Sequence, residues 1–254
     1  MFNEDYDLAS HTAIKKVKFL KKDKLGYFIS SMLAGFFVGL GVMLIYTIAG
    51  VMGDSPSIKV IQGISFTMPL CLVVFAGGEL FTGNNFTMTA GVMKKCIKAS
   101  DGIMLWVVCY LGNFAGAVAG ATLFTGTGLA YGQTLAMMNT AIIYKTSPDA
   151  MLLFIRGIMC NLVVASAIWC TYRVKSDSGK LIMIFWCMYA FVITGFEHCI
   201  ANMTLFTIGL LAPTAGELSI NAMANNMVFV TLGNIVGGVI IALAYYAISR
   251  KQES

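Results

Sequence analysis

The stretch that decides the fold is Gly77–Asn85, GGELFTGNN, which interrupts an apolar run from about residue 60 to about residue 93. As one α-helix, a run of this length would be roughly 50 Å long, whereas the hydrocarbon core of a bilayer is about 30 Å thick. Glycine and short polar side chains also disfavour helix in the middle of the run. Non-helical backbone survives at membrane depth only where it is buried in protein or lines a wet cavity. The stretch therefore predicts a broken membrane helix beside such a cavity.

A second interruption resembles the first. The apolar run at about 180–212 contains Thr194–Asn202, TGFEHCIAN, and it too is longer than one span requires. Glu79 is followed by an asparagine five residues later, and so is Glu197. The two breaks thus hold the same polar pair at the same spacing, which favours an internal repeat over coincidence.

A glycine-asparagine motif repeats in the same way. GNFAGAV at 112–118 recurs as GNIVGGV at 233–239, and glycines four residues apart let helix backbones approach closely. Each half of the chain has three apolar spans. Because three is odd, the halves must cross the membrane in opposite orientations, which is the architecture of an inverted-topology repeat. We expect an all-α membrane protein with an inverted 3+3 repeat in a single domain, 1–254, with repeats at about 27–130 and 150–248.

The composition supports a membrane protein. Hydrophobic residues make up 58% of the 254 residues and charged residues only 11%, against roughly 25% charged in soluble domains. This excludes a soluble enzyme, a disordered chain and a nucleic-acid partner. The seven cysteines form no CxxC pair, so neither a disulfide scaffold nor a zinc site is expected. We expect no metal and no other cofactor. The six apolar segments lie at about 27–52, 60–93, 103–130, 150–172, 180–212 and 224–248.

The basic residues predict the orientation. Fourteen of the seventeen basic residues lie in the termini and loops on one side of the predicted spans. Lys59 and Lys145 lie in loops on the opposite side, and Arg156 lies near a span end. By the positive-inside rule both termini are cytoplasmic, and the basic segment 1–26 is expected to form an amphipathic helix along the membrane. The other fourteen of the seventeen basic residues are Lys15, Lys16, Lys18, Lys21, Lys22, Lys24, Lys94, Lys95, Lys98, Arg173, Lys175, Lys180, Arg250 and Lys251.

Intramembrane ionisable groups are the natural candidates for function because they are costly to place there. Glu79 and Glu197 occupy matching positions, each with its asparagine, Asn84 or Asn202. We expect the two carboxylates to pin the breaks by accepting hydrogen bonds from backbone N–H groups that the broken helices free. A proton relay is the alternative for this pair.

Of the two histidines in the sequence, His198 lies within the predicted spans, in the second break. Its unperturbed pKa of about 6.5 would allow it to hold or lend a proton near neutrality. Thr82, in the first break, could present a hydroxyl opposite it. A buried core histidine is the ordinary alternative. A haem site would need a second ligand, and His11 lies in the N-terminal segment.

Bulky apolar residues surround both breaks. They could be plain core, or they could form narrow constrictions that gate by excluding water. Lys145 is either solvated in its loop or draws anions to an entrance. The candidate constriction residues are Phe66, Leu70, Leu80, Phe81 and Phe191.

At these residues the sequence resembles the formate/nitrite transporter family over about residues 10–250. The most specific elements are GELFTGN at Gly78–Asn84 and FEHCIANM at Phe196–Met203. Asn161-Leu162-Val163 with Trp169 is similar to the family's fourth-span pattern. The resemblance implies an aquaporin-like protomer, with its own pore, in a homopentamer of the bacterial cytoplasmic membrane. It also implies conduction of small monovalent anions of weak acids such as formate, nitrite and hydrosulfide.

The resemblance implies a role for individual residues. His198 matches the central pore histidine, and Thr82 the hydroxyl of the first-break loop. Asn161 matches a polar residue near that histidine, and Lys145 one on the outer side. A cytoplasmic-side lysine near the first span matches Lys15 or Lys16, and of the two we take Lys16 as the candidate. The constriction residues named above match the family's constrictions or lie close to its pore loop.

Among the family's branches, the chain looks most like the hydrosulfide channels, through general similarity that includes the run Thr82–Asn85. We therefore expect a channel, with transient protonation at or near His198 lowering the cost of crossing dry constrictions. The alternatives are a proton-coupled formate or nitrite transporter and, from another class, a membrane redox subunit. Conduction of water or glycerol is a further alternative, although the Asn-Pro-Ala box is absent.

Overall fold

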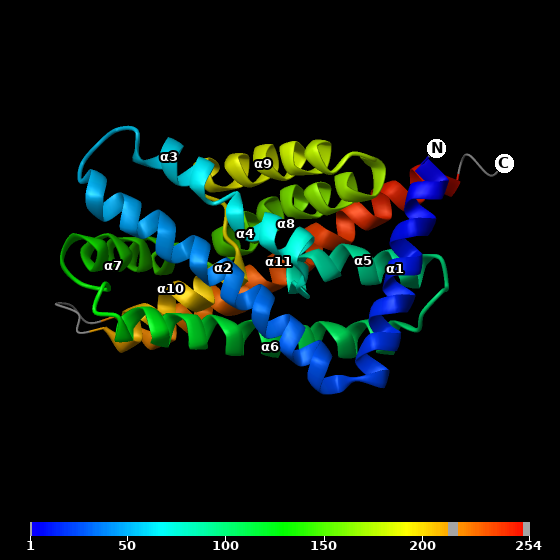
Figure 1. The fold of residues 1–254 in the computed structure, drawn as a ribbon, viewed down its shortest axis with the longest axis horizontal. Helices are drawn as coiled ribbons and strands as arrows, with labels where there is room; N and C mark the ends of the chain where they lie inside the picture. Colours follow the sequence, from blue (N-terminus) through cyan, green and yellow to red (C-terminus); the bar gives the residue numbers. More distant parts are fainter. Residues whose placement is uncertain (1, 213–217, 251–254) are drawn as a thin grey trace.

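The computed structural model describes residues 2–212 and 218–250, which leaves Lys251 outside the described part. Within these residues the chain forms helices and no β-strand (Figure 1). The elements are α1 (Phe2–Lys22), α2 (Lys24–Met52), α3 (Ile58–Ser65), α4 (Met68–Cys71), the π-helical segment η1 (Leu72–Gly77), α5 (Phe81–Met93), α6 (Ala99–Gly126), α7 (Gly132–Thr146), α8 (Ala150–Arg173), α9 (Asp177–Thr194), α10 (Cys199–Leu211) and α11 (Ile220–Arg250).

In the described part of the chain, six segments are long and apolar enough to cross a membrane, which confirms the six predicted spans. Residues 130–150, expected as a loop, contain the 15-residue helix α7 instead. The spanning segments are Lys24–Met52, Ile58–Gly77, Ala99–Gly126, Ala150–Arg173, Asp177–Thr194 and Ile220–Arg250.

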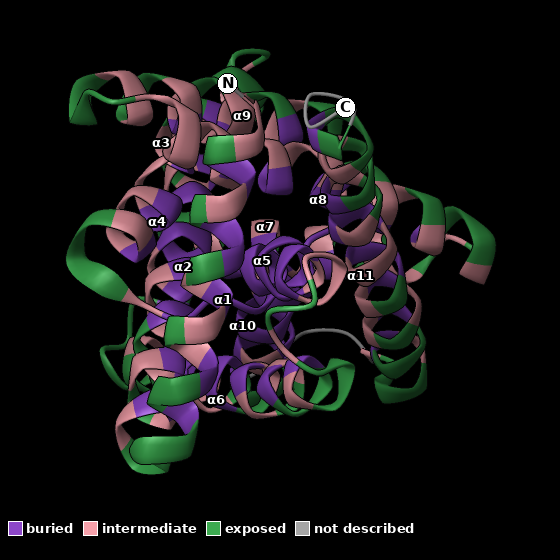
Figure 2. Ribbon diagram, turned by 90° about the vertical axis from the view of Figure 1, so that its right-hand side faces the viewer, coloured by how far each residue is buried: buried purple, intermediate pink, exposed green. Residues whose placement is uncertain are grey.

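Both predicted breaks are present. The second span ends at Gly77, three non-helical residues follow, and α5 begins at Phe81. The fifth span ends at Thr194, Gly195 takes a left-handed conformation with a φ of 75°, and α10 begins at Cys199. From the middle of the molecule, α5 and α10 run outward in opposite directions (Figure 1). Seen from the end of the molecule, both lie at its centre and are mostly buried (Figure 2).

Glycines hold the inverted repeat together at two equivalent helix crossings. In the first repeat α2 crosses α6, and a Cβ at Gly35 would overlap the backbone of Asn113. In the second repeat α8 crosses α11, and a Cβ at Gly233 would overlap the carbonyl oxygen of Phe154. The repeated glycine motif therefore marks backbone-to-backbone contacts, as predicted from its spacing.

One of these crossings gives a test of the packing. A Cβ at Gly116 in α6 would overlap the carbonyl oxygen of Met32 in α2, whereas one at Gly126 in the same helix meets nothing within 4 Å. We expect Gly116→Ala to destabilise the protein by about 1–3 kcal/mol, because the two backbones must move apart. Gly126→Ala should be neutral or stabilising by up to about 1 kcal/mol. Thermal unfolding in detergent measures both, and equal melting temperatures would contradict the close crossing.

Helix α1 lies across one end of the molecule, the end at which α11 finishes (Figure 1). The Tyr6 hydroxyl donates to the carbonyl oxygen of Ala242 over 3.1 Å, and Arg173 pairs with Asp5 at 3.0 Å. The buried residues of α1 recur every three or four positions, so the predicted amphipathic helix is docked by its apolar face onto the ends of the spans.

Candidate functional site

The two half-helices meet at their N-termini in the middle of the molecule. Thr82 lies in the first turn of α5, and His198 is the residue that caps α10. The Thr82 Oγ1 and His198 Nε2 atoms are 3.1 Å apart, and both side chains are buried. The expected juxtaposition of the two breaks is therefore present as a direct contact between one hydroxyl and one imidazole.

The other ring nitrogen of His198 shows which tautomer fits. The backbone N–H of Ala201 donates to His198 Nδ1 over 3.2 Å, so this nitrogen acts as an acceptor. In a neutral imidazole the proton then lies on Nε2, which donates toward Thr82. Protonating Nδ1 would break the cap of α10 and place a positive charge at a helix N-terminus, where the helix dipole opposes it.

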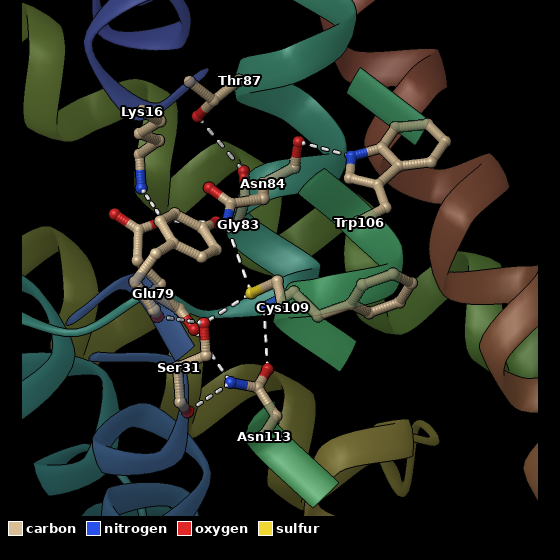
Figure 3. A network of polar contacts seen from close by, with 11 residues as sticks. Lys16, Ser31, Glu79, Gly83, Asn84, Thr87, Trp106, Cys109 and Asn113 are labelled. Atoms are coloured by element: carbon tan, nitrogen blue, oxygen red, sulfur yellow. Dashed lines mark hydrogen bonds and ion pairs between the residues drawn. The ribbon is translucent and has the colours of Figure 1, made fainter. Parts of the chain in front are cut away.

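Two asparagines from the repeated motif hold the breaks in place. Asn113 Oδ1 accepts from the N–H of Phe81 at 2.9 Å, and its amide donates to the carbonyls of Ser31 and Glu79 at 2.7 and 2.8 Å (Figure 3). Asn234 plays the same part in the other repeat. Its Oδ1 accepts from the first N–H of α10 at 3.0 Å, and its amide donates to the carbonyls of Gly157 and Glu197.

This corrects the expected role of the glutamates. The freed N–H groups are bound by Asn113 and Asn234, because these amides come from neighbouring spans and can accept and donate at once. From the sequence alone, these asparagines are recognised only as part of a packing motif. Their recurrence in both halves was the signal that could have found them.

The Glu79 carboxylate accepts from side chains rather than from the backbone. Lys16 Nζ lies 2.6 Å from its Oε2, Asn84 donates over 2.9 Å, and the Tyr27 hydroxyl donates over 3.1 Å (Figure 3). Burial lowers the pKa of Lys16, but the carboxylate of Glu79 more than offsets this and raises the pKa above its ordinary value. The lysine therefore stays charged around neutral pH.

Glu197 has the matching arrangement. Lys145 Nζ lies 3.0 Å from both of its oxygens, and Asn202 donates over 2.7 Å. Burial lowers the pKa of Lys145, but the carboxylate of Glu197 more than offsets this, so the net shift is upward. Lys145, expected in a loop, lies in the last turn of α7, and its carbonyl accepts from Asn226. Each repeat thus begins with a helix, α1 or α7, that brings one lysine to the glutamate of the break.

Two cavities flank the contact between Thr82 and His198. The α7-side cavity has a volume of about 190 Å³, and the α1-side cavity about 310 Å³. Each cavity is lined by one of the two Lys–Glu–Asn groups. The first also includes Tyr46, Gln62, Phe66, Phe191 and His198, and the second Val73, Leu80, Gly83, Ile168 and Tyr172.

The five candidate constriction residues are all buried, but their side chains lie in different parts of the structure. Phe66 and Phe191 line the α7-side cavity with ring centroids 5.6 Å apart, and Phe191 lies 6.0 Å from His198. Leu80 lines the α1-side cavity. Phe81 instead packs edge-on against Tyr110 of α6 at 5.0 Å, because the helical turn of α5 points it away from Thr82. Leu70 is buried and lines neither cavity.

Asn161 is buried next to Thr82 and lines neither cavity. Its amide donates to the carbonyl oxygens of Thr82 and Asn234 at 3.2 and 2.6 Å and to Asn85 Oδ1 at 3.1 Å. It therefore ties α8 to the first turn of α5 and to α11. Through Thr82, this amide supports the residue that contacts His198.

These features define a class of membrane transport protein: an inverted repeat of three spans with two broken helices whose N-termini meet between two cavities. The family model described as formate/nitrite transporter matches residues 3–248, and the chain belongs to this family. Its members are transporters and channels rather than enzymes, so the redox-subunit alternative is set aside.

Similar proteins agree with this assignment. The chain is 35% identical to the nitrite transporter NirC of Escherichia coli, over 99% of this chain and 94% of that protein. A solved structure described as an FNT family ion channel superposes with a TM-score of 0.91 at 31% identity, over 96% of this chain and 98% of the other. A pentameric formate channel with formate bound superposes with a TM-score of 0.79 at 29% identity, over 90% and 98%.

Proposed function

We propose that this protein is a channel for small monovalent anions of weak acids. The observation that carries the proposal is the pair of cavities, each with a partly buried lysine, on either side of a septum formed by His198 and Thr82 with the apolar side chains of Phe66, Phe191 and Leu80. Each of these lysines is paired with a glutamate, but Lys59 gives the α7-side cavity one further positive charge, which favours an anion there. The septum excludes bulk water, so a bare ion passes only if something compensates for lost hydration.

His198 and Thr82 supply that compensation. With its proton on Nε2, the neutral ring donates a hydrogen bond to an anion that displaces or joins Thr82. Full donation of that proton would leave an anionic ring in a dry site. Protonating Nδ1 first would cost the bond from Ala201 N–H. We therefore refine the expected proton role: His198 acts as a hydrogen-bond donor between the constrictions at Phe66, Phe191 and Leu80.

The finer parts of the proposal follow from the sequence. We propose hydrosulfide as the preferred anion on the resemblance of the first break, with formate and nitrite in the same class. The similarity to NirC and to the formate channel supports that class. We also propose one pore domain per chain in a homopentamer, on the likeness to the pentameric channel, with both termini in the cytoplasm.

A competitive flux panel tests the function. Purified protein in liposomes should pass hydrosulfide, formate and nitrite readily and chloride at least roughly tenfold more slowly. Chloride is the anion of a strong acid and a weaker hydrogen-bond acceptor, so the Nε2 donor of His198 compensates less for its lost hydration. Flux is measured for each anion alone and in competition, with protein-free liposomes as the control. Equal rates for chloride and formate would contradict the proposal.

The proton-coupled alternative has its own signature. A channel equilibrates each weak acid between the compartments and adds no accumulation beyond the distribution that the pH difference sets for a permeant neutral acid. Excess accumulation with an imposed pH gradient, abolished by a protonophore, would favour the formate or nitrite transporter instead. The experiment uses the same liposomes, so the two outcomes are directly comparable.

A further inference from the structure

The second half of α1 meets the start of α6 at the lower right of Figure 1. A basic cavity lies between these two helices. Its volume is about 380 Å³, and it is separate from the two cavities of the proposed pathway. Four lysines and one aspartate line it: Lys18, Lys21, Lys95, Lys98 and Asp101. The lining therefore has a net charge of three positive units, the difference between four lysines and one carboxylate.

Most of this charge is uncompensated. Lys21 Nζ pairs with Asp101 at 2.8 Å, whereas Lys18, Lys95 and Lys98 have no acidic partner among the residues that the structure describes. Lys95 has a φ of 57° because it ends α5 in a helix-capping turn, in which the N–H of Cys96 donates to the carbonyl oxygen of Gly91 over 2.9 Å. Three lysines without acidic partners around one cavity favour an anion there.

An apolar groove of about 370 Å³ continues from this cavity toward the membrane-spanning part of α6. Val17, Lys21 and Asp101 line both, so the two spaces adjoin. The rest of the groove is formed by Leu20 and Lys24 together with Met104 and Val108 of α6. Met104 lies in a spanning helix and is 59% exposed, so it is on the outer face of the protein.

We propose that the basic cavity and the groove together bind an anionic phospholipid. The phosphate sits among Lys18, Lys95 and Lys98, and an acyl chain lies along Leu20, Met104 and Val108. Lysine clusters on amphipathic helices beside a membrane span attract anionic headgroups. A soluble phosphate would use the cavity alone, whereas the adjoining apolar groove matches the amphipathic shape of a lipid.

The position of the site gives the lipid a structural effect. Lys16, on the same helix, reaches the Glu79 carboxylate that lines the α1-side cavity. A lipid bound between the end of α1 and the start of α6 would hold α1 against the spans, and with it Lys16 in place.

The charge arm of the test uses matched double variants of α1 and its neighbourhood. The full-length protein in detergent is titrated with phosphatidylglycerol and with phosphatidylcholine, and bound lipid is counted by native mass spectrometry. Lys18→Gln/Lys98→Gln should weaken phosphatidylglycerol binding roughly 25-fold, from roughly fivefold for each lysine near a headgroup. Lys15→Gln/Lys22→Gln removes the same charge from exposed positions outside the cavity and should leave binding within about twofold.

The apolar arm separates a lipid from a soluble anion. Met104→Ser should weaken phosphatidylglycerol binding severalfold, whereas Ile103→Ser, at an equally exposed position outside the groove, should not. Glycerol phosphate tests the headgroup alone and should compete poorly. Equal loss in both lysine pairs, no preference over phosphatidylcholine, or full competition by glycerol phosphate would each overturn the proposal. Melting temperatures confirm that every variant is folded.

Discussion

Glu197→Gln is expected to destabilise the protein by about 3–5 kcal/mol, because it leaves the largely buried ammonium of Lys145 without its counter-charge. The Glu197 side chain is 1% exposed and that of Lys145 19%, so solvent can do little to screen the unpaired charge. The neutral amide keeps the shape of the side chain and its contact with Asn202. The loss therefore reports the charge and not a cavity.

Two controls sharpen this result. Adding Lys145→Met to Glu197→Gln removes the stranded charge, and we expect most of the lost stability to return. Asp177→Asn breaks the exposed pair with Lys180, at 75% and 25% exposure, and should cost less than about 1 kcal/mol. Thermal unfolding in detergent compares all three variants. If the double variant is as unstable as Glu197→Gln, the lysine is not what makes the single change costly.

The sequence predicted the fold well because its strongest signals are local. A span too long for the bilayer with polar residues in its middle indicated each break, and the motif around Asn113 and Asn234 indicated the repeat. What it missed depends on distant partners. Phe81 is adjacent to Thr82 in sequence, yet one helical turn sends its ring toward Tyr110.

The partners of the two lysines could not be predicted from the sequence either. Lys16 and Lys145 are far in sequence from the glutamates they bind. Lys16 lies in a lysine-rich segment and Lys145 among polar and apolar residues, so the two positions do not resemble each other in sequence. Sequence alone gave no register for α1 against the spans and no sign that α7 is a helix docked at the second break. The equivalence of α1 and α7 emerges only when both lysines are seen at matching carboxylates.

His198→Asn is expected to reduce anion flux roughly tenfold or more at every pH, because it removes a hydrogen-bond donor to a charged group from a dry site. Asparagine is suited to this test. Its Oδ1 overlays the Nδ1 of histidine, so it can keep the cap on Ala201 N–H, and asparagine is among the best N-cap residues. Its amide has no atom at the position of Nε2, so the contact with Thr82 is lost.

The pH profile then distinguishes the two roles of the ring. If His198 only donates a hydrogen bond, flux through His198→Asn keeps the slope of the wild type between pH 5 and 8, at a lower level. If His198 supplies the proton, the slope disappears with the histidine. Thr82→Val should lower flux in the same way as His198→Asn, whereas Thr82→Ser, which keeps the hydroxyl, should stay close to wild type. Wild-type flux in both His198→Asn and Thr82→Val would remove this pair from the mechanism, since the septum would then pass anions without either donor.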